Sequence, residues 1–369
     1  MPVINRIAEF HPEMTAWRRD FHMHPEIGFE EVRTSGIVAA KLREFGVDEV
    51  HTGIARTGVV GVIRGSGASG RAIGIRADMD ALPIEEATGR PWASTIPGKM
   101  HACGHDGHTT MLLGAAKYLA ETRNFDGTVY LIFQPAEENL AGGEVMVKEG
   151  LFDRFPMDRI FGMHNWPGAP AGLFLHAPGP VMAAVANLEA TITGRGAHGA
   201  MARNVNPLEA GVITIGHFAG GHTFNVIPER VKLLGTARWF LPEVGDLLEA
   251  KFKEIVTGIA RAMGAEAECS FTRSSPATVN EAESTELAAR AARAVAGEAR
   301  TIALPQPTMG GEDFAFMLEK KAGAYLFLGG GTGAEDAMVH HPKYDFNDEI
   351  LPVGASWFAT LAEQLMPRG

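Results

Sequence analysis

The stretch that decides the fold is MHACGHDGHTTMLLGAA, residues 100–116. Three histidines, one aspartate and one of only two cysteines in the chain fall within the eight residues from His101 to His108. An amphipathic helical pattern follows directly. A polar turn that caps this helix would explain why polar residues stand before it, but not why so many soft metal-binding side chains are crowded there. We therefore interpret Cys103 and His105 as a thiolate and an imidazole held for chemistry on one short turn.

Composition narrows the class of protein. The chain has 369 residues, enough for two domains, and is 46% hydrophobic with a mean hydropathy of −0.01. A formal charge of −11 argues against nucleic acid and anionic membranes as partners. No apolar run approaches the ~18 residues that a membrane span needs. We identify no secretion signal, so we expect a cytoplasmic protein with reduced cysteines.

Strand and helix patterns alternate in the first part of the chain. Apolar strands are expected at 57–65, 71–80, 127–135 and 159–165, and helices at 3–22, 30–46, 109–121 and 142–150. Such alternation predicts an α/β fold with a parallel or mixed central sheet flanked by helices. Active sites of these sheets lie at the carboxyl ends of strands. Polar residues follow the expected strands at those ends: Asp78, Asp80, Glu137, Glu138 and His164.

The middle of the chain has a different order of expected strands and helices. We expect a strand at 185–194, a helix at 206–219, a hairpin at 223–240, a helix at 243–263 and a strand at 266–273. This βαββαβ order is typical of a ferredoxin-like α+β unit. The first pattern then returns, with helices at 285–296, 312–320 and 349–366 and a strand at 324–330. We predict a discontinuous catalytic domain, 1–181 and 295–369, interrupted by a smaller domain, 182–294.

Two glutamates follow the expected strand of IFQPAEEN, residues 132–139. Neighbouring residues at a strand end point to different sides, so one of Glu137 and Glu138 can bind a metal while the other moves protons. A solvated acidic loop is the alternative. Asp78 and Asp80 in RADMDALP are expected to face one side and to orient ligand histidines. A capped turn before Pro83 is the alternative there.

Two further histidines complete a candidate donor set. His164 follows a short apolar strand in FGMHNWPG, residues 161–168, and His341 precedes a proline in MVHHPKYDFND, residues 338–348. Each would be weak evidence by itself. Together with Cys103, His105 and a glutamate they make a nitrogen, sulfur and oxygen set that suits zinc or a neighbouring first-row ion. Five ligands exceed the three of a single catalytic zinc and fit a two-metal centre with open positions for water.

The order of motifs is similar to a known family. RRDFHMHPEIGFEE, RADMDALPIEE, MHACGHDGHTTMLLGAA, FQPAEE, GRGAHGA, FNVIPE, MGGEDFAFM and HHPKYDFND span essentially the whole chain. The set resembles the amidohydrolase branch of the co-catalytic dinuclear metallopeptidases, which includes hippurate hydrolases, bacterial aminoacylases and plant auxin-conjugate hydrolases. After FQPAEE the family often continues with glycines, whereas this chain reads NLAGG. That departure affects a loop and no expected ligand.

The resemblance implies a fold and a set of roles. It implies a dimetal catalytic domain, an inserted lid that commonly mediates dimerisation, and two divalent ions, with zinc, manganese, nickel and cobalt all acceptable. The implied metal ligands are Cys103, His105, Glu138, His164 and His341, with Glu137 as general base.

The inserted domain and the 309–317 motif add candidates for substrate binding. The resemblance implies that His198 stabilises an oxyanion, in its own site or a partner's, with Asn225 beside it; a turn cap is the alternative for His198. Arg238 would pair with a substrate carboxylate, or with a local acid. Gly310 and Gly311 are expected to offer backbone N–H groups before a helix N-terminus. Glu312 and Asp313 there would serve that helix as first-turn charges.

These expectations point to one reaction and two alternatives. We predict an enzyme that forms a homodimer or higher homo-oligomer through the lid domain and hydrolyses the amide bond of small N-acyl-L-amino acids with an activated water. A dipeptidase or carboxypeptidase on the same metal centre is the nearest alternative. A non-catalytic metal-binding scaffold is the remote one.

Overall fold

A computed structural model describes residues 3–67, 69–193, 211–222, 228–333 and 336–368 of the chain. These residues form two compact units. The larger comprises 1–179, 280–304 and 316–369, and the smaller comprises 180–279 and 305–315. Within the described residues, no helix combines the length and the apolar character that crossing a bilayer would require.

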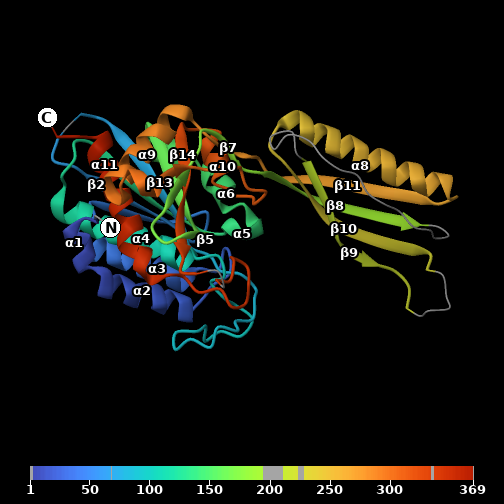
Figure 1. The fold of residues 1–369 in the computed structure, drawn as a ribbon, viewed down its shortest axis with the longest axis horizontal. Helices are drawn as coiled ribbons and strands as arrows, with labels where there is room; N and C mark the ends of the chain where they lie inside the picture. The colour runs from blue at the N-terminus through green and yellow to red at the C-terminus, as the bar shows by residue number, and fades with distance from the viewer. Residues whose placement is uncertain (1–2, 68, 194–210, 223–227, 334–335, 369) are drawn as a thin grey trace. The chain divides into compact units, whose positions relative to one another are not determined.

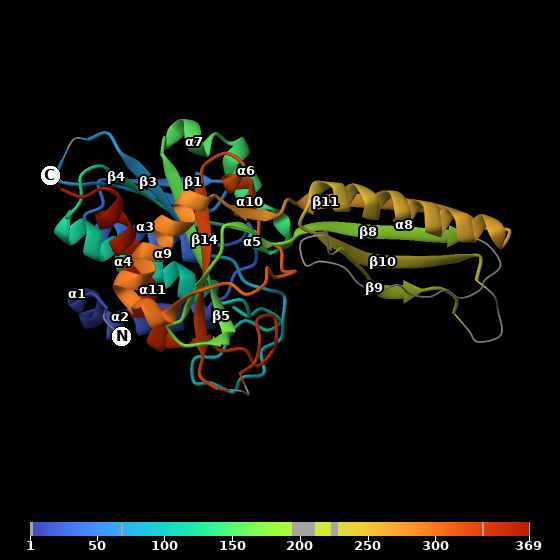
Figure 2. The ribbon, with the colours of Figure 1, turned by 45° about the horizontal axis from the view of Figure 1, so that its top comes forward.

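The larger unit is built on an eight-stranded mixed sheet, drawn in Figures 1 and 2. Its strands, in spatial order, are β1 (Glu49–Ile54), β2 (Gly58–Arg64), β4 (Thr128–Gln134), β3 (Ala72–Asp78), β5 (Arg159–Pro170), β14 (Gly323–Gly331), β6 (Phe174–His176) and β13 (Thr301–Ala303). The central strands β4, β3, β5 and β14 run parallel, and β1 and β2 are antiparallel additions. The sheet is therefore mixed, as expected.

Parallel strands bring their carboxyl ends to one edge of the sheet. Asp78, the last residue of β3, pairs in register with Gln134, the last residue of β4. His164 of β5 pairs with Phe327 of β14. This edge therefore collects the polar residues that follow β3 and β4, and His164 within β5, as the parallel registers require.

Helices cover the sheet and build the main core. They are α1 (Asn5–Glu9), α2 (His11–Met23), α3 (Val32–Glu44), α4 (His105–Thr122), α5 (Glu137–Leu140), α6 (Gly142–Lys148), α7 (Leu151–Arg154), α9 (Ala282–Ala296) and α11 (Leu351–Leu365). Helix α3 packs on β1 and β2, α4 on β3, and α9 on β14, while α11 packs against α4 and α9. Trp357 of α11 is fully buried, and its indole N–H donates to the carbonyl of Ala288 at 3.0 Å.

The smaller unit is a four-stranded antiparallel sheet with one long helix among its described residues. The sheet order is β11 (Glu266–Ser275), β8 (Ala184–Thr193), β10 (Arg230–Trp239) and β9 (Gly211–Ala219), and the helix is α8 (Pro242–Ala262). This is the strand order of a ferredoxin-like unit. Figure 1 shows α8 running along one side of this sheet. The chain passes from one unit to the other within two short strands, β7 (Gly179–Met182) and β12 (Thr278–Asn280), which pair with each other.

The predicted helix at 206–219 is wrong where the structure describes it. Residues 211–219 form strand β9, and β10 pairs with it in antiparallel register, Ala237 opposite Ile213. The hairpin is thus β9–β10, not a hairpin within 223–240. The apolar spacing of GVITIGHFA is compatible with a helix, but its β-branched residues favour the strand that pairing then stabilises.

Other boundaries also differ from the sequence-based prediction. The expected helix 3–22 is divided into α1 and α2, and strand β1 was not predicted. The expected helix 285–296 belongs to the larger unit, so the proposed boundary at 294–295 falls inside α9. The expected helix 312–320 is the four-residue α10 (Ala315–Leu318). Residues 305–315 instead group with the smaller unit.

Candidate metal centre

A glycine turn delivers the first two candidate ligands. Cys103 precedes Gly104, whose φ of 93° lies in the left-handed region, and His105 opens helix α4. A Cβ at position 104 would lie 2.4 Å from Oδ1 of Asn165, so both the backbone conformation and the close packing require glycine. Helix α4 begins four residues earlier than predicted. The thiol and imidazole are consequently held by regular structure, and both are buried.

His164 of β5 completes a first group with this turn. Its Nε2 lies 3.3 Å from the Cys103 sulfur, and its Nδ1 donates to the carbonyl of Asn165 at 2.7 Å. That bond leaves Nε2 without a proton and ready to ligate a metal. Ligand atoms of Cys103, His105 and His164 all lie within 4.8 Å of one another. All three side chains are buried.

The two glutamates leave a second left-handed turn. Strand β4 ends at Gln134, and Ala136 takes φ 54° and ψ 45° before Glu137 and Glu138 begin the one-turn helix α5. Carboxylate oxygens of both glutamates lie within 4.8 Å of a ring nitrogen of His105. The predicted juxtaposition of the strand end with the Cys103 turn is therefore present in the structure.

The histidine that reaches this site from the end of the chain is His340, not His341. Nε2 of His340 lies 3.1 Å from Oε1 of Glu138, and His340 groups with Cys103 and Glu138. His341 is exposed, and its Nδ1 accepts from the backbone N–H of Lys343 at 3.1 Å. The reason is the backbone: His340 has a φ of 66°, a left-handed turn that directs adjacent side chains apart. Sequence reasoning chose the wrong member of an HH pair.

Asp80 connects two of the candidate ligands. Its Oδ1 accepts from Nδ1 of His105 at 3.1 Å, and its Oδ2 accepts from the backbone N–H of Glu138 at 2.9 Å. The backbone carbonyl of Asp80 also accepts from His105 Nδ1, at 2.9 Å. These bonds place the His105 proton on Nδ1 and leave Nε2 available for a metal. The structure therefore contains the predicted contact between Asp80 and a histidine that is a candidate ligand.

Asp78 acts mainly on a histidine that sequence reasoning left without a role. Its Oδ1 accepts from Nδ1 of His108 at 2.6 Å, whereas it lies 3.9 Å from Nε2 of His105. Arg76 donates to Oδ2 of Asp78 at 2.5 Å. The backbone N–H of Asn165 donates to Nε2 of His108 at 3.0 Å. The signal for His108 was present, because it lies three residues after His105 and so shares its helix face.

Electrostatics of the site favour a bound cation. Burial raises the pKa of the Cys103 thiol, and the charge of Glu138 raises it further. Burial opposes a charge on His105, but nearby carboxylates, Asp78 foremost, outweigh this and raise its pKa to about 10. Among the described residues, Nε2 of His105 is buried and has no hydrogen-bond partner. The residues therefore fit a divalent metal, which would neutralise the charge of the carboxylates and take Nε2 of His105 as a ligand.

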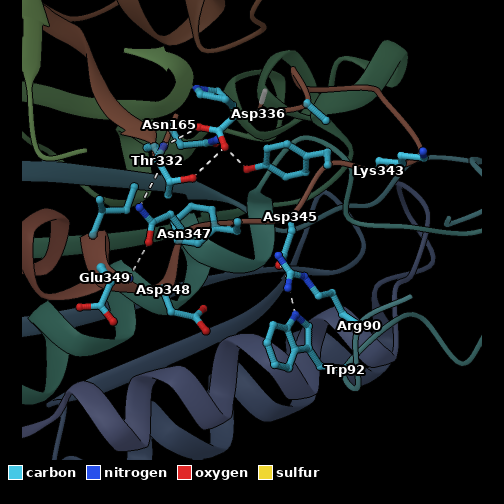
Figure 3. A pocket seen from close by; sticks show the side chains of 16 residues that line it. Arg90, Trp92, Asn165, Thr332, Asp336, Lys343, Asp345, Asn347, Asp348 and Glu349 are labelled. Carbon is cyan, nitrogen blue, oxygen red and sulfur yellow. Dashed lines mark hydrogen bonds and ion pairs between the residues drawn. The ribbon is translucent and has the colours of Figure 1, made fainter. Parts of the chain in front are cut away.

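A separate cavity of about 400 Å³ borders Asn165 and Tyr344 (Figure 3). Nδ2 of Asn165 donates to the Tyr344 hydroxyl at 2.7 Å. Asp345 accepts from the Trp92 indole at 3.2 Å and pairs with Arg90 at 2.9 Å. The described residues that line it include none of the candidate metal ligands. We therefore assign the chemistry to the metal cluster.

The candidates outside the larger unit divide into two groups. His198 and Asn225 lie outside the described residues. In the smaller unit, Arg238 donates to the backbone carbonyl of Met309 at 2.6 Å. This partner is a backbone group and not the local acidic side chain that was the alternative to a substrate carboxylate.

The expectation for Gly310 and Gly311 also changes. The N–H of Gly310 donates to Oγ1 of Thr308 at 3.2 Å, and a Cβ at Gly311 would lie 2.5 Å from Val185. Helix α10 begins only at Ala315, so no helix N-terminus follows these glycines directly. Close packing within the smaller unit accounts for Gly311. Glu312 accepts from the N–H of Phe314 at 2.9 Å, a local turn instead of a helix-dipole contact.

Comparison with known proteins decides the family. Residues 74–364 match the model of peptidase family M20/M25/M40. The chain belongs to this family. It is 40% identical to a hippurate hydrolase of Campylobacter jejuni over 98% of this chain and 99% of that protein. It is 36% identical to an N-acetylcysteine deacetylase of Bacillus subtilis, covering 96% of this chain and 97% of that protein.

Solved structures agree with this assignment. A dinuclear metal-binding M20 peptidase of Bacillus subtilis, the YXEP protein, superimposes with a TM-score of 0.82 at 34% identity, covering 97% of this chain and 99% of that one. The amidohydrolase branch that the motifs resembled is therefore confirmed. An M20 peptidase chain with such relatives is a hydrolase of amide bonds.

Proposed function

We propose that this protein hydrolyses N-acyl-L-amino acids to a carboxylate and a free amino acid in a metal-dependent reaction. The observation that carries the proposal is a set of three overlapping groups of candidate ligands, which share members and together contain Cys103, His105, Glu137, Glu138, His164 and His340. Relatives named hippurate hydrolase and N-acetylcysteine deacetylase support acyl amino acids as the substrate class. A structural relative described as dinuclear supports two ions.

Each side chain has a proposed role. Cys103, His105, Glu138, His164 and His340 would hold two divalent ions, and this mixed donor set accepts zinc, manganese, nickel or cobalt. When bound, the ions supply Lewis-acid activation of the amide carbonyl and of the attacking water. Asp80 keeps His105 in the tautomer that can bind a metal. Asp78 holds His108 against β5.

Glu137 is the proposed proton carrier. It leaves the same turn as Glu138, and a carboxylate oxygen of Glu137 lies within 4.8 Å of the ligand atoms of His105 and Glu138, close enough to accept a proton from a water held there. The protonated acid can then donate to the departing nitrogen, and general acid–base catalysis of this kind contributes ~10²–10⁴-fold. From the family resemblance, we propose that His198 stabilises the oxyanion, with Asn225 beside it.

We also propose that two copies associate through the smaller unit. Strand β9 is an edge strand whose residues are all exposed, and Ile213, Ile215 and Phe218 share the face of Ala237, the face that α8 covers elsewhere. An apolar edge strand is a template for pairing with another strand, and a second copy offers the same strand.

We propose a cytoplasmic setting as well. Both cysteines are free thiols, which supports a reducing compartment.

A substrate panel on metal-depleted protein tests the proposal. Protein reloaded separately with Zn²⁺, Mn²⁺, Ni²⁺ or Co²⁺ should hydrolyse benzoyl- or acetyl-amino acids faster than free dipeptides. Preference for dipeptides would instead identify a dipeptidase or carboxypeptidase. Protein that binds metal but is inert across the panel would identify a non-catalytic scaffold, and either result would reject the proposal.

A further inference from the structure

A carboxylate from the N-terminal segment reaches the turn that carries the two glutamates. Glu31 is fully buried. Its Oε1 accepts from the backbone N–H of Ala136 at 2.8 Å, and its Oε2 accepts from the Thr57 hydroxyl at 2.6 Å. Burial raises the pKa of Glu31, while the bond from Thr57 opposes this increase. Each oxygen thus has a donor, and one of those donors is the residue immediately before Glu137.

The turn at Ala136 needs external support. A non-glycine residue in the left-handed region is strained, and Ala136 has φ 54°. Helix α5 has only four residues and offers little stability of its own. The carbonyl of Ala136 accepts from the N–H of Gly142 at 2.9 Å, and Glu138 N–H is held by Asp80. Glu31 supplies the contact on the remaining side of this turn, at the Ala136 N–H.

The same N-terminal segment also packs directly on Ala136. A Cβ at Gly28 would lie 2.9 Å from the Ala136 Cα and 2.8 Å from the Leu140 side chain. Three residues before Glu31, the chain therefore has no room for any other side chain. Contact at Gly28 and hydrogen bonding at Glu31 converge on one backbone unit.

We propose that Glu31 is a positioning residue: its buried carboxylate holds the left-handed turn at Ala136 and so fixes the directions of Glu137 and Glu138. The inference rests on the proposed function for the roles of those two glutamates. It assigns Glu31 no contact with substrate. Its effect is to keep the metal-binding and proton-carrying carboxylates in one geometry.

Two substitutions at Glu31 separate this role from simple burial. Glu31→Gln keeps an amide oxygen for the Ala136 N–H, because the Thr57 hydroxyl can rotate from donor to acceptor. Glu31→Leu removes both acceptors and leaves the Ala136 N–H buried and unpaired. We expect Glu31→Leu to lower kcat and weaken metal binding by ~10–100-fold, as outer partners of metal ligands do, and Glu31→Gln to restore most of both.

Glu26→Leu is the matched control. Glu26 lies in the same segment and accepts from the backbone N–H groups of Arg33 and Thr34 at 3.0 and 2.8 Å, at the start of α3. Its loss should lower Tm as Glu31→Leu does but leave kcat and metal affinity unchanged. Gly28→Ala, which keeps every charge, should lower kcat and metal affinity in the direction of Glu31→Leu, and it serves if that variant does not fold.

The measurements are kcat and KM on the best acyl-amino-acid substrate, Tm, and Zn²⁺ affinity by chelator competition. Metal affinity within twofold of the Glu26→Leu value in both Glu31→Leu and Gly28→Ala would overturn the inference. Equal losses in Glu31→Gln and Glu31→Leu would also overturn it. Because Zn²⁺ affinity does not depend on turnover, these outcomes judge Glu31 even if the wild-type protein proves inactive on every acyl amino acid, which would reject only the proposed function.

Discussion

Replacing Asp80 with asparagine should break the link between two candidate ligands. Asparagine has the shape of aspartate, but one oxygen becomes an NH₂ donor. Both partners of Asp80 are donors: the backbone N–H of Glu138 at 2.9 Å and the Nδ1–H of His105 at 3.1 Å. If the NH₂ faces Glu138, two donors oppose each other. If it faces His105, it opposes the Nδ1–H, which then keeps only the backbone carbonyl of residue 80, at 2.9 Å, as an acceptor.

The size of the effect follows from the number of bonds lost. One hydrogen bond to a charged group contributes about 1.5–3 kcal/mol, and each 1.4 kcal/mol is a factor of ten in an equilibrium constant. Asp80→Asn cannot keep both bonds, so metal affinity should fall by ~10–100-fold, in the range found for partners of metal ligands. Turnover at saturating metal should fall as well, because Glu138 loses its backbone anchor.

Chelator competition on metal-free protein measures the affinity, and thermal melting of the same samples measures stability. Asp158→Asn is a matched control, because Asp158 accepts from the N–H of Ala72 at 2.9 Å, at the opposite end of β3. It should change Tm without changing metal affinity. Asp80→Asn protein that binds Zn²⁺ within twofold of wild type would refute the reasoning that the Asp80 carboxylate holds His105 and Glu138 for metal binding.

Three other outcomes are expected. Glu137→Gln should retain its metal content but lose ~10²–10⁴-fold in kcat, and near-native turnover would exclude Glu137 as the proton carrier. His340→Ala should lose bound metal and activity whereas His341→Ala keeps both, and the reverse pattern, read by metal analysis, would restore the sequence-based choice. Burial opposes a charge on His22, but its hydrogen bond to Asp106 and its ion pair with Glu86 prevail and raise its pKa to about 9. This raised pKa means that protonated His22 stabilises the fold fully below pH 6.5, by about 3 kcal/mol, and that this contribution is lost as the pH rises through 9. Tm measured from pH 6 to 10 should therefore decline more steeply in the wild type than in His22→Gln, and parallel curves would contradict the assignment.

Sequence reasoning worked best where one residue type has few uses. Cys103, His105 and His164 were identified because thiolate and imidazole groups at strand ends and helix starts are uncommon without a chemical role, and the structure brings them together. It failed at His340, because two adjacent histidines are equivalent in sequence and only the positive φ at position 340 distinguishes them. It failed at β9, because local apolar spacing cannot report the neighbouring strand β10 that makes a strand the stable choice.

By itself, the sequence determined the chemical character of the site, the alternation of strands and helices, and the existence of a second unit, because these follow from local composition and periodicity. The tertiary structure decided what depends on backbone direction and long-range contact. It selected His340, paired Asp78 with His108, and brought Glu31 to Ala136 across 105 positions of the chain. Such contacts join segments whose separation in sequence carries no distance information, and only the packed sheet and its helices place them within hydrogen-bonding range.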